Sequence, residues 1–241
     1  APRLQRRKQR PEPGALERAH SAEYPWDVAK RMAAGGLLGI TVDDKDGGIG
    51  GKLMDAVLAI EQVASVCPRS ADVIQAGNFG AIRVLARFGT PEQKMRYLQP
   101  LLAGEALIAV AMSEPDAGSA VTELSTTARP EGDGFRITGS KVFTTHGLHA
   151  TVFLVYVRYG PGVEGIGSVL VERGADGLSF GKPSHFLGGE DWNPMFFDNV
   201  YVPPENVLLG RDGFKKQMAG FNVERIGNTA RSLALGRHAY E

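Results

Sequence analysis

Apolar side chains recur at helical spacing through the first part of the chain. Two segments show this spacing, and a glycine-rich loop at 43–51 separates them. The apolar positions are Val28 and Met32 in the first segment and Leu53, Val57, Ile60 and Ala64 in the second. Because intervals of three and four residues bring side chains to one face of a helix, both segments are predicted to be helices. A Gly-Gly pair at 35–36 is expected to end the first helix.

A further helix is predicted from the capping chemistry of residues 90–93. The Thr90 hydroxyl can accept a hydrogen bond from the first turn, Pro91 suits the first helical position, and Gln93 completes a capping box. Pro100 has no amide hydrogen to donate, so we expect the helix to end or kink at that residue.

After residue 105 the spacing changes to that of strands. Phe135 and Ile137 alternate with polar residues behind an Asp-Gly pair at 133–134, which predicts a turn followed by a strand. Further segments rich in valine and aromatic residues lie at 151–158, 167–173, 177–182 and 195–203. No helical pattern separates these segments, so they are predicted to form a β-sandwich or barrel.

Helical spacing returns near the end of the chain. The predicted apolar face holds Phe214, Met218, Phe221 and Ile226, and the pattern runs to the last residue without a stop signal. A long amphipathic helix needs a partner to bury its face, so this segment is predicted to open a further helical domain.

These patterns predict an α+β chain of several domains. We expect an N-terminal helical domain at 1–108, a middle β-barrel or sandwich domain at 109–211, and the first helix of an incomplete C-terminal helical domain at 212–241. The 241 residues are enough to bury a core in more than one compact layer.

Charge and cysteine content narrow the possible partners and location. Lysine plus arginine and aspartate plus glutamate both total 27, so the chain as a whole has no electrostatic attraction to nucleic acid or membranes. The basic cluster at 3–10 contains no aromatic residue and is predicted to be a solvated arm. Cys67 is the only cysteine, which excludes a disulfide framework, and no apolar run reaches membrane-spanning length. We therefore expect a soluble, cytoplasmic protein with no nucleic-acid or membrane partner.

Two patterns that often mark cofactor or metal sites have ordinary structural interpretations here. Gly160, Gly162 and Gly165 match a dinucleotide-binding spacing, but a predicted strand follows them instead of a helix, so a hairpin connection is predicted. His146 and His149 are three residues apart, but no acidic or cysteine partner has the spacing of a metal ligand. No metal site is predicted.

Two segments, AMSEPDAGSA at 111–120 and KVFTTHG at 141–147, carry the remaining candidate chemistry. The first is a polar turn behind an apolar run, and it can present backbone amides together with Ser113 or Ser119 to a polar ligand. The second ends a predicted strand with Phe143 and two threonines, which suit the wall of a site for a flat ring system. Each segment considered alone is more often an ordinary surface turn.

Taken together, these segments resemble those of the acyl-CoA dehydrogenase family of flavoproteins. The turn at 111–120 is similar to the family pattern A-x-T/S-E-P-x-A-G-S-D, and ITGSKVFTTHG at 137–147 is similar to I-x-G-x-K-x-W/F-I-T-N-G. FFDNVYVPPENVLLG at 196–210 and FGTPEQKMRYLQPLLAGE at 88–105 resemble two further family segments. The four segments occur in the family's order.

The resemblance implies a bound FAD, with its ring between the middle and C-terminal domains. By position in the family patterns, Ser113 and Ser119 would contact the flavin ring edge and the pyrophosphate. Phe143 would pack against the isoalloxazine ring, and Thr145 would hydrogen-bond near its N5 and O4 atoms. Neighbouring positions that would line the same site are Met112, Gly118 and Thr144.

The resemblance also implies α,β-dehydrogenation of an acyl thioester, either an acyl-CoA or an acyl-carrier-protein thioester. In this reaction a carboxylate removes the α-proton while the β-hydride passes to flavin N5, and an electron-transfer flavoprotein reoxidises the flavin. Glu224, followed by Arg225, matches the helix that carries the base in isovaleryl- and long-chain-type members. The substrate-binding positions implied are Ser119, Asn222 and Arg225. A homodimer or homotetramer is expected.

Several alternatives stay open at this point. Asn222 stands where many relatives have an aspartate that contacts the CoA chain, and Ala120 replaces the last aspartate of the turn pattern, so a carrier-protein thioester is a second substrate hypothesis. The family's late glutamate has no counterpart in this sequence, so the base is either Glu224 or a residue outside it. A non-catalytic partner subunit or fragment and a flavin monooxygenase of the same fold are the alternative functions.

Overall fold

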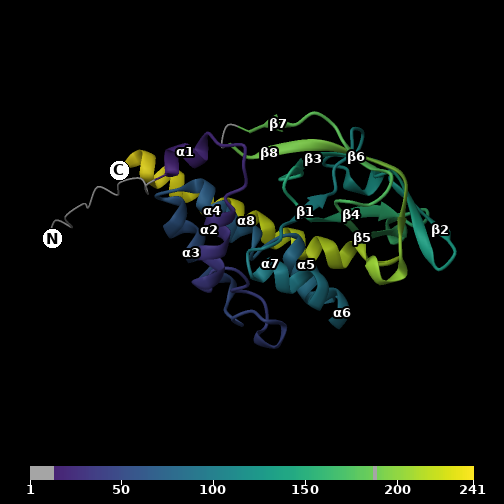
Figure 1. Cartoon of the computed structure of the whole chain (residues 1–241), viewed down its shortest axis with the longest axis horizontal. Coiled ribbons are helices and arrows are strands. Elements are labelled where there is room, and N and C mark those ends of the chain that lie inside the picture. Colours follow the sequence, from purple (N-terminus) through teal and green to yellow (C-terminus); the bar gives the residue numbers. More distant parts are fainter. Residues whose placement is uncertain (1–13, 187–188) are drawn as a thin grey trace.

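The computed structural model of the chain describes residues 14–186 and 189–241. The N-terminal helices gather at one end of the molecule and the strands at the other, and one long helix near the C-terminus passes along both (Figure 1). The basic cluster at 3–10, predicted to be a solvated arm, lies outside the described residues. Within the described ranges, no helix is both long enough and apolar enough to cross a membrane.

The N-terminal part is helical, as the apolar spacing predicts. Its helices are α1 (Ala15–Ala19), α2 (Trp26–Ala34), α3 (Leu53–Ala64), α4 (Pro68–Ala76) and α5 (Ala81–Phe88), followed by the short α6 (Pro91–Gln93) and α7 (Gln99–Leu102). Both helices predicted from periodicity are confirmed: α2 ends at Ala34 with Gly35 as its C-cap, and α3 buries Ile60 and Ala64. The glycine-rich loop between them contains a short 3₁₀ turn, η1 (Asp44–Asp46).

The predicted capping box is present at the start of α6. The Gln93 amide donates to Thr90 Oγ1 at 3.2 Å, and the Thr90 amide donates to Gln93 Oε1 at 3.0 Å. The helix does not end at Pro100, however, because α7 continues to Leu102. A π-helical segment, η2 (Lys94–Leu98), directly precedes Pro100. Its wider turn accommodates the hydrogen bond that a proline cannot donate, so the helix continues through Pro100.

The middle part forms one β-sheet. The strands are β1 (Ile108–Ala111), β2 (Thr127–Glu131), β3 (Gly134–Thr145), β4 (Val152–Arg158), β5 (Ile166–Glu172), β6 (Leu178–Phe180), β7 (Ser184–His185), β8 (Asp191–Val202) and β9 (Val207–Leu209). Short 3₁₀ turns, η3 (Val121–Glu123), η4 (Val163–Gly165) and η5 (Pro204–Asn206), connect some of them. The strand order is β6-β8-β3-β2-β4-β5-β9, with β1 parallel to β4 and β7 antiparallel to β8.

Strand β4 shows where the core lies. Its residues alternate between two hydrophobic clusters, as the two-residue period of a strand requires. Phe153, Val155 and Val157 belong to one cluster, and Val152, Leu154 and Tyr156 belong to the other. The second cluster includes residues of α5 and the start of the last helix. The sheet is therefore covered by helices on this side, which is why nearly every residue of β4 is buried.

The predicted turn before Phe135 is confirmed as a hairpin, with a shift of one residue. Strands β2 and β3 pair up to Glu131 and Gly134, so the turn residues are 132 and 133, whereas the sequence analysis placed the turn at 133–134. Gly132 adopts a left-handed φ of 62°, which glycine reaches without steric cost at the first position of a two-residue hairpin turn.

The glycine spacing at 160–165 belongs to a hairpin connection, as predicted. It joins the antiparallel strands β4 and β5 through the turn η4, and a strand follows it. The Tyr159 amide donates to the Gly165 carbonyl at 2.7 Å and closes the loop. The helix start that a dinucleotide-binding loop requires is therefore not formed at this position.

The last helix, α8 (Phe214–Tyr240), is confirmed, but its buried face differs from the predicted one. Met218 packs against the core as expected, whereas Ile226 is 41% exposed. The residues that α8 buries are Gln217, Gly227, Ala230 and Ala234. A Cβ at Gly227 would lie 3.2 Å from the Gln75 side chain, so small residues let α8 pack closely on α4. This close approach, more than apolar spacing, decides which face is buried.

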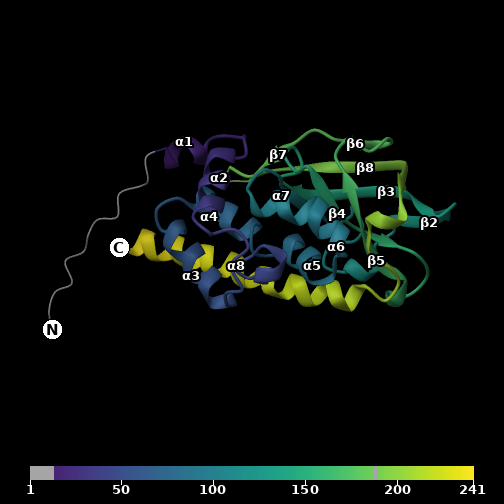
Figure 2. The ribbon, with the colours of Figure 1, turned by 60° about the horizontal axis from the view of Figure 1, so that its bottom comes forward.

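Helix α8 ties the helical part to the sheet. Ala230 and Ala234 pack in a cluster with Ile60 of α3, while Phe214 and Met218 join the cluster beneath the sheet. Figure 2 shows α8 running beside α3 and α5 along the length of the molecule. The start of α8 is therefore held by strands and its later turns by the N-terminal helices.

A buried ion pair joins the turn after β1 to strand β3. Lys141 Nζ lies 2.8 Å from Glu114 Oε1 and donates to the Met112 carbonyl at 3.1 Å, and Lys141 is 0% exposed. The same carboxylate accepts hydrogen bonds from the amide and hydroxyl of Ser125 and from the amide of Thr126. The ion pair therefore holds the polar turn at 111–120 against β3, beside the segment that carries Phe143.

Burial and pairing shift the pKa values of both partners. Burial raises the pKa of the Glu114 carboxyl, but the Lys141 ammonium and the hydrogen bonds from Lys141, Thr126 and Ser125 outweigh it and lower this pKa to about 2. Burial lowers the pKa of Lys141 to about 8, against the opposing effect of the Glu114 carboxylate. Both groups are therefore charged at neutral pH.

Replacing Lys141 with methionine leaves the Glu114 carboxylate buried without its cation. We expect Lys141→Met to lower the free energy of unfolding by about 3–5 kcal/mol, measured by urea denaturation. The matched control is Arg31→Met, which breaks the exposed 2.9 Å Arg31–Asp27 pair and is expected to cost less than about 1 kcal/mol. A loss in Lys141→Met no larger than that of the control would contradict the role given to this pair.

The low pKa of Glu114 also predicts an acid dependence of stability. The pKa of the Glu114 carboxyl is about 2 in the folded chain, whereas its ordinary value, taken for the unfolded chain, is 4.5. The stability that the Glu114 carboxylate contributes is therefore fully present above about pH 4.5. It is lost as the pH falls through the folded pKa. We expect the difference in unfolding free energy between the wild-type chain and Glu114→Gln to shrink over this window. A difference that stays constant from pH 5 to pH 2.5 would show that Glu114 is not stabilised as its carboxylate.

Candidate functional site

One cleft collects residues from the N-terminal helices, the sheet and α8. Its volume is about 320 Å³, and it lies where β1 and the end of β3 meet α4, α5 and α8. The residues predicted from the sequence that line this cleft are Met112, Ser113, Phe143, Thr145, Glu224 and Arg225. Segments that are distant in the sequence therefore converge here.

Phe143 presents its ring to solvent at the end of β3. Its backbone has a left-handed φ of 56°, and the residue is 57% exposed. The ring packs 4.6 Å from Trp192, at an angle of 49°, and Trp192 lies 6.4 Å from Phe186. A strained backbone that exposes an aromatic ring is typical of a ligand-binding position, and these rings form a surface on which a flat ring can stack.

The turn after β1 lies only partly in the cleft. Met112 and Ser113 line it, whereas Gly118 and Ser119 lie on the exposed outer part of the same turn. A Cβ at Gly118 would meet no heavy atom within 4 Å, so the space beside it is open. An extended ligand can therefore reach from the cleft to the outer part of the turn without displacing protein atoms.

The two threonines after Phe143 occupy different environments. Thr145 lines the cleft, whereas Thr144 is 0% exposed, and its main chain pairs with Asn193 of β8. Thr144 Oγ1 has no hydrogen-bond partner among the described residues. Successive residues of a strand point to opposite faces, so only one of the two threonine side chains reaches the cleft.

Glu224 faces the cleft from α8 and is held by α4. Gln75 Nε2 donates to Glu224 Oε1 at 2.6 Å and to Asn228 Oδ1 at 2.8 Å. Burial raises the pKa of the Glu224 carboxyl, the Gln75 hydrogen bond lowers it, Asp72 raises it and Arg231 lowers it, and the net result is a raised pKa. A half-buried carboxyl with a raised pKa can accept a proton near neutral pH, which makes Glu224 a candidate general base.

The backbone before α5 lies against the same carboxyl group because residue 80 is glycine. Gly80 has a left-handed φ of 63°, and a Cβ there would lie 2.9 Å from Glu224 Oε2. Any larger residue would be strained and would press on the carboxyl group. Gly80 therefore gives the Glu224 side chain the space it occupies.

A buried charge network forms another wall of the cleft. Asp72 Oδ2 lies 2.7 Å from His146 Nε2 and 3.7 Å from Arg69 Nη1, and Asp72 Oδ1 accepts a hydrogen bond from Arg231. Arg231 also lies 3.1 Å from Glu190. Burial raises the pKa of Asp72, but His146, Arg231 and Arg69 outweigh it and hold this pKa below its ordinary range. This wall is therefore charged.

The two predicted substrate positions on α8 are placed differently. Arg225 lines the cleft, whereas Asn222 is exposed outside it and accepts a hydrogen bond from Arg225 Nη1 at 2.6 Å. Asn222 can therefore contact only a ligand that extends out of the cleft. It can also contribute indirectly, by orienting the Arg225 side chain.

Polar residues that the sequence analysis missed also line the cleft. They are Asp72, Gln75, His146, Asn228 and Arg231. The sequence contains a signal for two of these residues. Asn228 and Arg231 follow Glu224 at intervals of four and seven residues, so they lie on the same face of the helix. Asp72 and Gln75 had none, since they reach the site only through the packing of α4 on α8.

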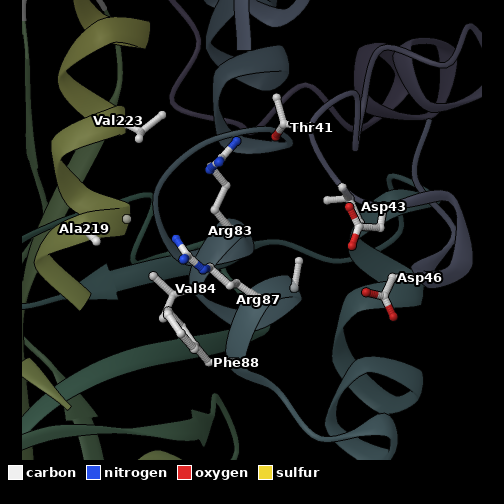
Figure 3. A pocket seen from close by; sticks show the side chains of 12 residues that line it. Thr41, Asp43, Asp46, Arg83, Val84, Arg87, Phe88, Ala219 and Val223 are labelled. Atoms are coloured by element: carbon white, nitrogen blue, oxygen red, sulfur yellow. The ribbon is translucent and has the colours of Figure 1, made fainter. Parts of the chain in front are cut away.

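A second cavity, also of about 320 Å³, contains none of the predicted residues. Figure 3 shows Arg83 and Arg87 pointing into it from α5, with Asp43 and Asp46 on the facing loop. Asp46 is paired with Lys94 at 2.7 Å. The aromatic side chain in the lining of this second cavity, Phe88, has the cations of Arg87 and Lys216 over its ring. The candidate site is therefore the first cleft.

The residues of the first cleft suit a flat ring system with polar edges. Phe143 supplies an exposed aromatic face, and the Ser113 and Thr145 positions place hydroxyl groups at the cleft wall. No group of three or more His, Cys, Asp or Glu residues that could hold a metal ion is found in the described parts of the chain. On these observations the site fits a flavin.

Family models match the chain in two consecutive parts. The model described as acyl-CoA dehydrogenase, N-terminal domain, matches residues 6–105, and the model described as acyl-CoA dehydrogenase, middle domain, matches residues 109–200. An acyl-CoA dehydrogenase of Bacillus subtilis (strain 168) is 34% identical over 225 residues, which are 91% of this chain and 59% of that protein.

Solved structures share the fold. Butyryl-CoA dehydrogenase from Megasphaera elsdenii superposes with a TM-score of 0.86 at 30% identity, covering 94% of this chain and 62% of that chain. A glutaryl-CoA dehydrogenase from Mycobacterium smegmatis in complex with FADH2 gives 0.85 at 25% identity, covering 97% and 59%. This chain thus spans about six tenths of the length of these relatives.

These similarities confirm the main expectations drawn from the sequence. The helical N-terminal part, the β-sheet middle part and the beginning of a C-terminal helical part are those of the matched structures. Two of the solved relatives are flavin complexes, the glutaryl-CoA dehydrogenase with FADH2 and PigA with FAD, which agrees with the cofactor expected from the sequence. From its matched domains, its fold and its flavin-type cleft, the chain belongs to the acyl-CoA dehydrogenase family of flavoprotein oxidoreductases.

Proposed function

We propose that this chain carries the flavin-binding and proton-abstracting part of an enzyme that dehydrogenates acyl thioesters at the α and β carbons. The single observation that supports this most is the convergence of Phe143, Ser113 and Thr145 with Glu224 in one cleft. Membership of the acyl-CoA dehydrogenase family supports the reaction class. The substrate is an acyl-CoA, with an acyl-carrier-protein thioester as the second candidate.

In this proposal Glu224 removes the proton from the α-carbon of the acyl group. Gln75 holds Glu224 by Oε1, while no hydrogen bond to Oε2 is found among the described residues. Oε2 is therefore available to accept the proton, and the raised pKa of the carboxyl makes the transfer more favourable near neutral pH. Bound FAD would supply the acceptor for the hydride of the β-carbon.

The remaining predicted residues bind and orient the ligands. Phe143 would pack against the flavin ring, Ser113 and Thr145 would hydrogen-bond its edges, and the main chain at Met112 and Thr144 would border it. The exposed outer turn, with Gly118 and Ser119, would contact the pyrophosphate, and its open surroundings support this role. The positions proposed for the CoA side are Ser119, Asn222 and Arg225.

The redox partner in this proposal is an electron-transfer flavoprotein. A solved structure whose title names the electron-transferring flavoprotein of Acidaminococcus fermentans matches this chain with a TM-score of 0.87 at 30% identity, covering 94% of this chain and 61% of that chain. A homodimeric or homotetrameric assembly and a cytoplasmic location stay predictions of the sequence.

The role of Glu224 predicts the behaviour of Glu224→Gln. The variant keeps the shape and the partner Gln75 but cannot take up a proton, so FAD should stay bound. The flavin absorbance of the FAD-loaded chain should bleach at least about a hundredfold more slowly under anaerobic mixing with an acyl-CoA. In the wild-type chain, bleaching should accelerate as rising pH deprotonates Glu224, through a pKa above its ordinary value.

The control for Glu224→Gln is Glu61→Gln, which removes a carboxylate paired with Arg237 outside the cleft and should leave bleaching unchanged. Unchanged bleaching in Glu224→Gln would exclude Glu224 as the base. Flavin that reacts with oxygen but not with any acyl thioester in the wild-type chain would favour a monooxygenase over a dehydrogenase.

The aromatic platform predicts the effect of Phe143→Ala on FAD affinity. Loss of the stacking face should weaken FAD binding by up to about tenfold, measured by the quenching of FAD fluorescence in a titration. Phe196→Ala is the matched control, since Phe196 is 47% exposed on β8 and does not line the cleft. Equal affinities of the Phe143 and Phe196 variants would contradict the placement of the flavin ring against Phe143.

A further inference from the structure

Helix α8 presents a polar stripe to the cleft beyond Glu224. Asn228 and Arg231 follow on the same face, and Phe221 precedes Glu224. At about 1.5 Å of rise per residue, Arg231 lies about 10 Å along the helix from Glu224. An acyl group whose α-carbon is at Glu224, and which runs away from the CoA positions at Asn222 and Arg225, therefore extends toward Asn228 and Arg231.

Helix α4 supplies a matching polar row. Gln75 bridges Glu224 and Asn228 through Nε2, and Asp72 holds Arg231, one turn earlier on the same face of α4. The two rows are in register, so hydrogen-bonding groups face this part of the cleft from both helices, next to apolar residues such as Ala76, Phe79 and Phe221. An alkyl tail that covered the polar groups would not replace their contacts with water.

Donors on this wall remain available to a ligand. Asn228 Oδ1 accepts from Gln75, which leaves its Nδ2 hydrogens unused, and Arg231 Nε and Nη2 have no hydrogen-bond partner among the described residues. The Arg231 side chain is 21% exposed and anchored through Nη1 by Asp72 and Glu190. The free donors are therefore held in a fixed place, which favours a ligand that offers an acceptor oxygen.

The surrounding charges allow either a neutral or an anionic oxygen. The groups facing this wall are the carboxylates Asp72, Glu190 and Glu224 and the cations Arg69 and Arg231, with His146 adjacent to Asp72. Asp72 and Glu190 are each paired with Arg231, and Asp72 also lies 3.7 Å from Arg69. The carboxylates beside Arg231 are therefore paired with cations, which leaves room for an acceptor group on the ligand.

We propose that this cleft selects short acyl groups whose far end carries an acceptor oxygen, a hydroxyl or a carboxylate, and that Arg231 and Asn228 are the residues that recognise it. This inference rests on the proposed function. Arg231 and Asn228 are the direct contacts, and Asp72 and Glu190 are positioning residues that hold the guanidinium group. A purely aliphatic acyl group of the same length leaves the donors unpaired and binds more weakly.

The test compares three CoA thioesters with six-carbon acyl groups, hexanoyl-CoA, 6-hydroxyhexanoyl-CoA and adipoyl-CoA, by their dissociation constants for the FAD-loaded chain. We expect at least one of the two oxygen-bearing thioesters to bind about tenfold more tightly than hexanoyl-CoA. A preference for the hydroxyl alone, the carboxylate alone or both identifies the end group and supports the proposal. Equal dissociation constants for all three thioesters overturn it.

Substitutions test whether Arg231 and Asn228 cause the preference for oxygen-bearing acyl groups. Arg231→Met and Asn228→Ala should each reduce the preference. Asn228 is an exposed residue, and after its truncation Gln75 Nε2 still donates to Glu224 Oε1. The matched control is Arg237→Met on the same helix, which breaks the Arg237–Glu61 pair outside the cleft and should leave the preference unchanged. A preference that persists in both Arg231→Met and Asn228→Ala overturns the assignment.

The failure of the inference is distinguishable from failure of the proposed function. If the FAD-loaded chain binds no CoA thioester, or if the chain takes up no FAD, the proposed function fails and the inference fails with it. If all three thioesters bind with equal affinity and all three bleach the flavin, the proposed function stands. Only the selection for a polar end group is then contradicted.

Discussion

The buried ion pair between Glu114 and Lys141 is the constraint on which the site depends. Lys141 belongs to the strand that ends in Phe143, and Glu114 belongs to the turn that carries Ser113, so one 2.8 Å contact sets the separation between the aromatic wall and the polar turn. Such a pair requires further hydrogen bonds to be tolerated in the interior, and Ser125 and Thr126 supply them to the carboxylate. The turn that carries Ser113 is thereby held against the strand that ends in Phe143.

The second constraint is the close packing of α8 on α4. Gly227, Ala230 and Ala234 bring the two helices together, and the polar residues on the adjoining stripe then meet across a short gap. Gln75 can bridge to Glu224 only because of this approach. The same packing that stabilises the helical part therefore raises the pKa of the proposed base by burial and lines the cleft beyond it with hydrogen-bonding groups.

Local patterns predicted the elements well, because helical spacing, the capping box at Thr90 and the alternation around Phe135 are each decided by neighbouring residues. They failed where tertiary packing decides, because small residues formed the buried face of α8 in place of Ile226. At Pro100, where an end or a kink was predicted, the helix does not end, and a π-helical segment precedes the proline. For the site, motif positions placed the residues around Phe143 and Glu224, whereas the contributions of α4 depend on contacts between distant segments that no local pattern records.

The flavin content of the purified chain tests the central claim most directly. It is measured from the absorbance spectrum and from the mass of the released cofactor, before and after incubation with FAD. A chain whose polar turn and Phe143 wall form a flavin site should carry close to one FAD per chain after reconstitution. A folded chain that takes up no FAD under these conditions would contradict the account.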